Sequence, residues 1–161
     1  MPQTRPDTSD RPSNLPWPPI ILVLVIVVAI VLGHVAPLQW PGLDDSAAHY
    51  IGLGLGALGV ALLIAAIVTL RMAGTTVRPD AGSTALVTTG LYRRFRNPIY
   101  LADCLILFGI AELTKNVRFA IAAVVFGLLV TWLAILPEEA YLERRFGRAY
   151  LDYKAKSRRW I

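Results

Sequence analysis

Long uninterrupted apolar runs dominate this chain, beginning with Ile-Leu-Val-Leu-Val-Ile-Val-Val-Ala-Ile-Val-Leu at residues 21–32. Hydrophobic residues make up 55% of the 161 residues, above the roughly 45–50% that is usual for soluble domains. One small aqueous core cannot bury that much apolar surface, so we expect the lipid bilayer to be the solvent. Continuous runs also lack the alternation of a membrane β-barrel. The sequence therefore predicts an all-α integral membrane protein.

Four segments approach the length of about 20 residues that a helix needs to cross a bilayer. They are residues 19–36, 47–72, 98–113 and 117–136. The third is the shortest, so a tilted, kinked or partly inserted helix is an open alternative there. The fold expected is about four transmembrane helices in a single domain, residues 19–161, preceded by a disordered cytoplasmic tail, residues 1–18, rich in Pro, Asp, Ser and Thr.

The segment after the last span predicts a cytoplasmic C-terminal amphipathic helix. Pro137 suits a first helical turn, and Glu138 and Glu139 place negative charge at the positive end of the helix dipole. An apolar stripe at spacings of 4, 4 and 3 residues would lie on the bundle or at the membrane interface. The stripe consists of Leu142, Phe146, Tyr150 and Tyr153.

The distribution of basic residues predicts the orientation in the membrane. If the N-terminus is inside, fourteen Lys and Arg residues fall on the cytoplasmic side and two on the other. Because cytoplasmic loops are enriched in Lys and Arg, both termini are expected to face the cytoplasm, in an inner or cell membrane. The net charge of +5 then indicates contact with anionic lipid headgroups and does not indicate nucleic-acid binding.

Cysteine and histidine are too scarce for a His/Cys metal site, so no metal is expected. Cys104 is the single cysteine, and His34 and His49 are the only histidines. The stretch Gly54–Gly59 matches G-x-G-x-x-G, but it lies inside an apolar span with no strand before it. Gly52 and Gly56 form G-x-x-x-G, which allows close approach of helices in lipid. Helix packing is therefore the preferred interpretation of these glycines.

Two linked motifs carry the strongest functional signal. The first contains Gly90, Tyr92 and the run Arg96-Asn97-Pro98-Ile99-Tyr100; the second contains Glu138-Glu139, then Leu142, Phe146-Gly147, Tyr150 and Tyr153. Their order and gaps resemble the isoprenylcysteine carboxyl methyltransferase family and its phospholipid-methylating relatives, which carry G-x-Y-x-x-x-R-H-P-x-Y and then E-E-x-x-L and F-G-x-x-Y-x-x-Y. The resemblance covers about 80 residues, from Thr84 to the C-terminus.

The resemblance implies a small helical membrane enzyme with a cytosol-facing pocket for S-adenosylmethionine and a lipophilic or amphipathic methyl acceptor. Carried over by position, Glu138 matches a carboxylate near the acceptor. The cofactor contacts that the resemblance implies are Thr84, Ala85, Leu86, Val87, Tyr92, Asn97, Pro98, Ile99 and Tyr100.

The chemistry of such a cofactor suits these residue types. The faces of Tyr92 and Tyr100 would attract its sulfonium, and Arg96 would bind its carboxylate. Arg96 and Glu138, the carboxylate near the acceptor, are therefore the candidate catalytic residues. Glu138 or Glu139 would pair with its ammonium or orient the acceptor. Asp103 lies one helical turn after Tyr100, and because an intramembrane carboxylate is costly, a role in the substrate pocket is expected beside a purely structural alternative.

Two departures from the family pattern keep alternatives open. Asn97 stands where the family has histidine, and Ala134 stands where eukaryotic members have an arginine. Asn97-Pro98 also suits the N-cap and first position of the third span. The competing hypotheses are a nicotinamide-dependent membrane reductase with a layout like that of steroid reductases, and a non-catalytic membrane accessory protein.

Overall fold

The computed structural model describes residues 17–36, 38, 46–74 and 86–161. Within these ranges every named element is helical, and the one β-bridge joins Phe95 to Arg158. The elements in chain order are α1 (Trp17–Val35), α2 (Ser46–Met72), the short 3-10 helix η2 (Gly90–Arg93), α3 (Pro98–Thr114), α4 (Arg118–Val130), the π-helical turn η3 (Thr131–Ile135), α5 (Leu136–Phe146) and α6 (Arg148–Lys156).

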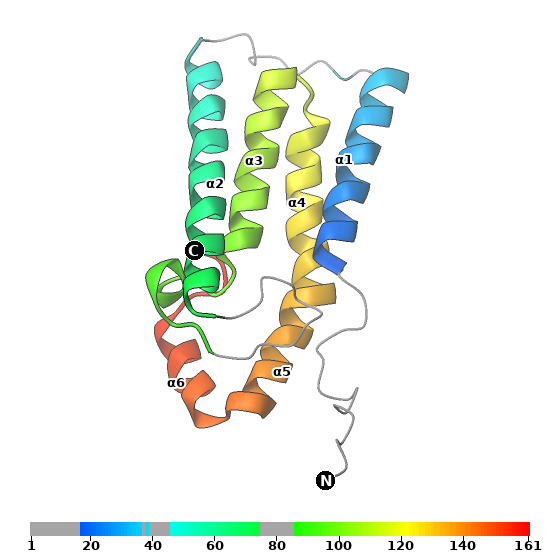
Figure 1. Cartoon of the computed structure of the whole chain (residues 1–161). Helices are drawn as coiled ribbons and strands as arrows, with labels where there is room; N and C mark the ends of the chain where they lie inside the picture. Colours follow the sequence, from blue (N-terminus) through cyan, green and yellow to red (C-terminus); the bar gives the residue numbers. More distant parts are fainter. Residues whose placement is uncertain (1–16, 37, 39–45, 75–85) are drawn as a thin grey trace.

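Four long helices stand side by side in the order α2, α3, α4, α1 (Figure 1). The most extensive contact joins α2 to α3, followed by α3 with α4 and α1 with α4. The buried apolar cluster lies along α4, with Phe126 and Val130 fully buried, and receives Leu107 from α3 and Ile21 from α1. Many large apolar side chains on the outer faces of these helices remain exposed, as expected where lipid is the solvent.

Three helical stretches are long and apolar enough to cross a membrane: Trp17–Val35, Ser46–Met72 and Arg118–Phe146. The all-helical membrane architecture predicted from the sequence agrees with this finding. Helix α3 has 17 residues and lies between α2 and α4 (Figure 1); its crossing of the bilayer, and with it the count of four spans, stays a prediction.

The N-terminal boundary of α1 differs slightly from the expected one. The predicted disordered tail ended at residue 18, but α1 begins at Trp17, and Pro18 and Pro19 lie in its first turn, where their missing N–H groups cost no helical bond. Residues 1–16 lie outside the described residues, so the disorder predicted for them stays a prediction.

The last long helix does not stop where the sequence suggested. Helix α4 continues through the π turn η3 into α5, and the N–H of Leu136 bonds to the carbonyl of Thr131, five residues earlier. The predicted separate start at Pro137 is therefore a position inside one continuous helical stretch. A π turn inserts one extra residue and changes which face of the helix follows. It thereby sets the direction in which Glu138 and Glu139 point.

Gly147 ends α5 and corrects the predicted apolar stripe. Its φ of 53° and ψ of −125° lie where a side chain is strongly disfavoured, so the tail is two helices, α5 and α6, and not one. Tyr141, absent from the predicted stripe, is buried on α5, and Tyr150 is buried on α6. Helix α6 folds back toward η2 (Figure 1).

Glycines allow α2 and α3 to approach closely, as the sequence predicted. A Cβ built on Gly109 would lie 2.6 Å from the Cα of Gly56, and one on Gly59 would lie 2.9 Å from the carbonyl oxygen of Ala102. The G-x-G-x-x-G stretch is thus in the middle of a helix, at a helix–helix contact. The helix-packing interpretation is confirmed.

The polar segments gather at one end of the row. Figure 1 shows η2, α5, α6 and the C-terminus at the end opposite the connection between α3 and α4. The described part of the second connection and the tail after Pro137 therefore lie together. This is the arrangement that the two linked motifs require.

Candidate functional site

The C-terminal segment is tied to the residues that precede α3. The N–H of Arg96 donates to the carbonyl of Arg158 at 2.8 Å, and the N–H of Arg158 donates to the carbonyl of Arg94, also at 2.8 Å. The Nδ2 of Asn97 donates to the carbonyl of Arg159 at 3.0 Å. Asn97 is the residue before α3, as predicted, but its side chain makes no capping bond, because it binds the C-terminal segment instead.

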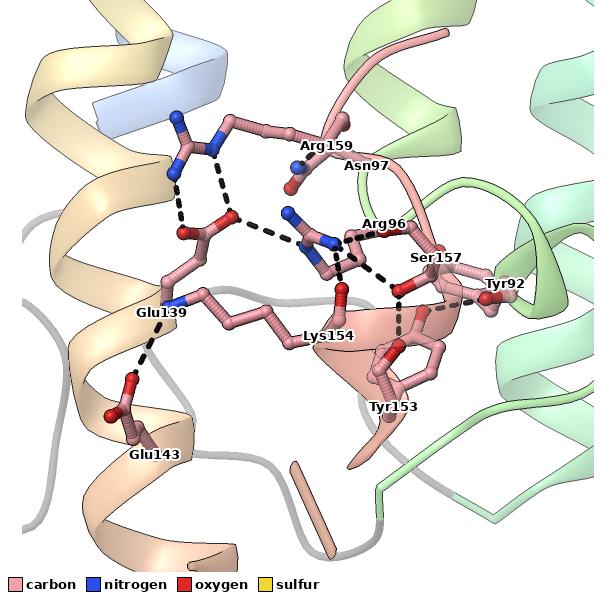
Figure 2. A network of polar contacts seen from close by, with 9 residues as sticks. All are labelled: Tyr92, Arg96, Asn97, Glu139, Glu143, Tyr153, Lys154, Ser157 and Arg159. Atoms are coloured by element: carbon pink, nitrogen blue, oxygen red, sulfur yellow. Dashed lines mark hydrogen bonds and ion pairs between the residues drawn. The ribbon is translucent and has the colours of Figure 1, made fainter. Parts of the chain in front are cut away.

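The guanidinium of Arg96 lies at the centre of a polar network (Figure 2). Its Nε is 3.3 Å from Oε1 of Glu139. Its Nη1 donates to the carbonyl of Lys154 at 3.1 Å and to the carbonyl and Oγ of Ser157. Arg96 therefore joins α3, α5 and α6, and its predicted role toward a ligand carboxylate would compete with these contacts.

Glu139 binds two arginines at once. The Nε and Nη2 of Arg159 reach its two carboxylate oxygens at 2.9 and 2.7 Å, and Arg96 shares the first oxygen. Glu139 is only 6% exposed, and a buried carboxylate is stable when it is paired in this way. The hydrogen bond to Glu139 raises the pKa of Arg159 above its ordinary value. Glu139 thus has its charge compensated by the protein itself.

Glu138 is the neighbouring carboxylate and has a different environment. It is half-buried and accepts no hydrogen bond within the described residues. Its charge acts on the hydroxyls of both Tyr92 and Tyr100, so the three groups lie near one another. The charge of Glu139 is therefore compensated by two arginines, whereas Glu138 lies near the side chains of Tyr92 and Tyr100.

The tyrosines around Glu138 are held by specific contacts. The hydroxyl of Tyr153 donates to the carbonyl of Tyr92 at 2.6 Å, which anchors η2 on α6. Burial first, and then the charge of Glu138, raises the pKa of Tyr92 well above its ordinary value. Burial also raises the pKa of Tyr153 to about 12. The ring of Tyr100 packs edge to face on Phe126 of α4 at 6.5 Å. The hydroxyls of Tyr92 and Tyr153 therefore stay protonated at neutral pH.

The other predicted site residues have varied positions. Thr84 and Ala85 lie outside the described residues. Leu86 and Val87 precede η2 and are half-buried, and Ile99 is half-buried beside the buried Pro98. Asp103 is half-buried on α3, and its charge acts on Tyr100, which agrees with the predicted shared face. The structure brings the two motifs together; whether these residues bind a ligand stays a prediction.

Sequence reasoning did not assign a role to several residues that build this region. Arg159 supplies the bidentate contact with Glu139, and Ser157 and the Lys154 carbonyl hold Arg96. The family resemblance extends to the C-terminus and therefore includes Arg159, so a signal for its importance existed. No spacing in the sequence predicted that Arg159 binds Glu139.

The profile of the phospholipid methyltransferase family matches residues 47–149. This match covers more than half of the chain, from the start of α2 to the start of α6. The chain belongs to the phospholipid methyltransferase family, a family of membrane methyltransferases. The family resemblance inferred from the two motifs is thereby confirmed.

Two relatives extend the comparison. The nickel-cobalt-cadmium resistance protein NccN of Alcaligenes xylosoxydans xylosoxydans is 29% identical over 138 residues, which is 85% of this chain and 59% of that protein. An uncharacterized protein of Haemophilus influenzae is 36% identical over 63 residues, which is 39% of this chain and all of that protein. The chain thus spans only 59% of the length of NccN. No solved structure matches.

Proposed function

We propose that this chain transfers the methyl group of S-adenosylmethionine to a lipophilic or amphipathic acceptor at the cytoplasmic face of the membrane. The observation that carries the proposal is the meeting of the two motifs at one end of the helical row, where Arg96 contacts Glu139 at 3.3 Å and Glu138 lies near Tyr92 and Tyr100. Membership of a methyltransferase family supports it over a nicotinamide-dependent reductase and over a non-catalytic role.

The residues at this end fit the chemical groups of S-adenosylmethionine. Tyr92 and Tyr100 offer aromatic faces for a sulfonium. Glu138, which accepts no hydrogen bond within the described residues, offers an anion for an ammonium. When bound, the cofactor would supply an electrophilic methyl group: its S–CH₃ bond would break as the acceptor forms its bond to the methyl, and the electron pair would stay on sulfur.

The protein contributes orientation and a proton acceptor. The network of Arg96, Glu139 and Arg159 fixes α5 against α3 and the C-terminus, which fixes the position of Glu138. One oxygen of Glu138 accepts from the ammonium of the cofactor, and the other takes the proton that a protic acceptor loses on methylation. Half-buried and fully buried side chains around it exclude water from the reacting groups.

The membrane supplies the acceptor, and the charge of its surface determines how the protein is oriented in it. Exposed apolar side chains along α1, α2 and α4 face lipid, so an acceptor dissolved in the bilayer reaches the site laterally. The many basic residues of the second connection and of the tail favour the cytoplasmic leaflet. We infer from these features an integral membrane protein whose site opens at the cytoplasmic headgroup level.

Methyl transfer in reconstituted vesicles tests the proposal. The purified chain is incubated with methyl-labelled S-adenosylmethionine and vesicles of bacterial lipid extract, and lipids that gain one methyl group are sought by mass spectrometry. The wild type is expected to label a lipid-soluble product, and Glu138→Gln to lose most of that labelling. Asp152→Asn, an exposed carboxylate on α6, is the matched control and should keep it. Absence of label with folded wild-type protein would contradict the proposal for this class of acceptor.

A further inference from the structure

Asp103 is a carboxylate on an apolar helix, and the proposed function gives it no task. It is half-buried in the second turn of α3, and no charge of a described residue compensates its own. The protein seals three polar atoms that lack partners among the described residues, on Arg118, Tyr141 and Tyr150, and the Asp103 oxygens are not among them. Because a carboxylate is costly on such a helix, it in general marks a functional site. Asp103 is therefore unpaired and open to its surroundings.

The hydroxyls of Tyr92 and Tyr100 and the carboxylate of Glu138 are unpaired in the same way. Within the part of the chain that the structure describes, none of these groups is sealed without a partner, although Tyr92 is only 9% exposed. The charges of Glu138 and Asp103 both act on the Tyr100 hydroxyl, and Glu138 also acts on Tyr92. Four polar ends in one neighbourhood thus leave their hydrogen-bonding capacity to something other than the protein.

The two open carboxylates make this group of side chains negative. Glu139 and Glu143, at the same end of the molecule, are paired with basic side chains. Asp103 and Glu138 contact no Lys or Arg among the described residues. The rings of the two tyrosines add aromatic faces, which also attract cations. Such a group of side chains binds a positively charged ligand group and repels a carboxylate.

The positions of the two carboxylates separate a cofactor side from an acceptor side. Glu138 lies on α5, at the polar end of the molecule, and the carboxylate whose charge acts on it is Glu139, not Asp103. Asp103 lies five residues after Pro98, about 7.5 Å further along α3, in the direction that leads away from the polar end (Figure 1). A water-soluble cofactor approaches from the polar end and a lipophilic acceptor from the bilayer. Asp103 is therefore on the side of the acceptor.

We infer that Asp103 pairs with a positively charged group of the methyl acceptor, so that the acceptor is a cationic amphiphile with an apolar tail and an ammonium group. This inference rests on the proposed function and deepens it, because it names the charge of the acceptor. Asp103 binds the acceptor and takes no part in making or breaking bonds. Glu138 keeps its place beside the cofactor. An acceptor whose polar group is a carboxylate is repelled.

Two amide variants on the same helix separate this role from a structural one. Asp103→Asn keeps the size of the side chain and removes its charge. Because Asp103 has no partner among the described residues, its loss should not lower the thermal midpoint of the ligand-free protein. Glu112→Gln is the matched control: Glu112 lies at the other end of α3 and pairs with Lys115, so its removal should not affect a ligand at Asp103.

Photolabelling in vesicles of uncharged galactolipid tests the inference on the full chain with S-adenosylmethionine present. The probe is a tritiated long-chain quaternary ammonium with a diazirine beside the nitrogen; its nitrogen is fully substituted and cannot be methylated, so it reports binding alone. We expect saturable labelling of α3 in the wild type, displaced by hexadecyltrimethylammonium and not by hexadecanoate. Asp103→Asn should weaken probe binding about tenfold, because a charge-assisted contact is lost. Glu112→Gln should leave it unchanged.

Other results would overturn the inference. Equal labelling of the wild type and Asp103→Asn, or displacement by hexadecanoate as strong as that by the quaternary ammonium, would mean that Asp103 selects no cation. A lowered thermal midpoint with weaker labelling would assign Asp103 to structure alone. Affinity for S-adenosylmethionine, measured on the same vesicles, should be equal in both proteins; a loss in Asp103→Asn would assign Asp103 to the cofactor. If the folded wild type does not bind S-adenosylmethionine, the proposed function itself fails, which is a separate result.

Discussion

Two buried carboxylates lie at opposite ends of this molecule, and their partners differ. Glu112 is 4% exposed near the end of α3 that adjoins α4, and it pairs with Lys115, three residues later, and with His49 at 3.9 Å. Glu139 is 6% exposed at the other end. It pairs with Arg96 and Arg159, which are 43 and 20 residues away in the sequence.

The difference concerns what each charge holds together. The side chains of Lys115 and His49 are 39% and 47% exposed, so water can solvate them if Glu112 changes. Arg96 is only 11% exposed and joins three separate segments. Both partners of Glu112 are exposed, and this pair compensates a charge near a helix end. The network of Glu139 includes the buried Arg96 and holds separate segments of the candidate site together.

Insertion of one alanine after Trp132 is expected to have the largest effect on the Glu139 end. Trp132 is 73% exposed and lies in the π turn, which already accommodates one extra residue, so a second one turns α5 by about 100° relative to α4. Glu138 and Glu139 would then point away from Arg96, at a cost of more than about 3 kcal/mol in the free energy of unfolding. Thermal unfolding in detergent and cofactor binding measure this. Trp132→Leu keeps the register and should retain both properties; an insertion variant that still binds would refute the assigned role of the turn.

Exchanging each carboxylate for an amide compares the two ends directly. Glu139→Gln leaves Arg96 buried without its counter-charge and should reduce the free energy of unfolding by about 3 kcal/mol. Glu112→Gln should reduce it by less than about 1 kcal/mol, because Lys115 moves into water. Equilibrium unfolding of both variants in the same detergent decides. Equal losses would remove the distinction between the two ends.

A methyl group on Gly52 tests how tightly the Glu112 end is packed. A Cβ at this position would lie 2.3 Å from the Cβ of Glu112, so Gly52→Ala must displace α3 from α2, at a cost of about 2 kcal/mol. Gly54 has no atom within 4 Å of its Cβ position, and Gly54→Ala is the matched control, with stability unchanged or slightly raised. Similar midpoints for the two variants would contradict the close approach.

Arg159→Gln should reduce stability less than Glu139→Gln does. Arg159 is 38% exposed, and Arg96 still compensates Glu139, so a loss of about 1.5 kcal/mol is expected from the missing charged hydrogen bonds. The control is Arg148→Gln, because Arg148 pairs with Asp152 at the surface and should contribute at most about 0.5 kcal/mol. If Arg148→Gln lowers the free energy of unfolding as much as Arg159→Gln does, the pair of Arg159 with Glu139 stabilises the protein no more than a surface pair.

Most of the helical architecture could be predicted from the sequence, because apolar runs and glycine spacing are local properties. The bounds of α2 and α3 match the expected ones within a residue, and the close approach at Gly56 and Gly109 follows from the G-x-x-x-G pattern. The π turn could not be predicted, because the residues of 131–135 are ordinary helix formers in a membrane and their geometry depends on what α5 must contact.

The candidate site could be predicted in its members but only partly in its contacts. The motifs named Arg96 and Glu139, and the structure joins them. The bidentate contact of Arg159 arises because Gly147 turns α6 back toward α3, and no periodicity in the sequence encodes that path. Tyr150 was expected on a stripe that lies on the bundle or at the interface; it is fully buried on α6, the helix that follows the turn at Gly147.

The central claim is that S-adenosylmethionine binds at the end of the molecule that holds Glu138. Equilibrium binding of labelled S-adenosylmethionine to the purified chain, in wild type, Glu138→Gln and Glu112→Gln, tests it most directly. We predict saturable binding by the wild type, the same affinity for Glu112→Gln, and at least a tenfold weaker affinity for Glu138→Gln, because a charge-assisted contact is lost. Binding that Glu138→Gln retains in full, or that folded wild-type protein lacks, would contradict the claim.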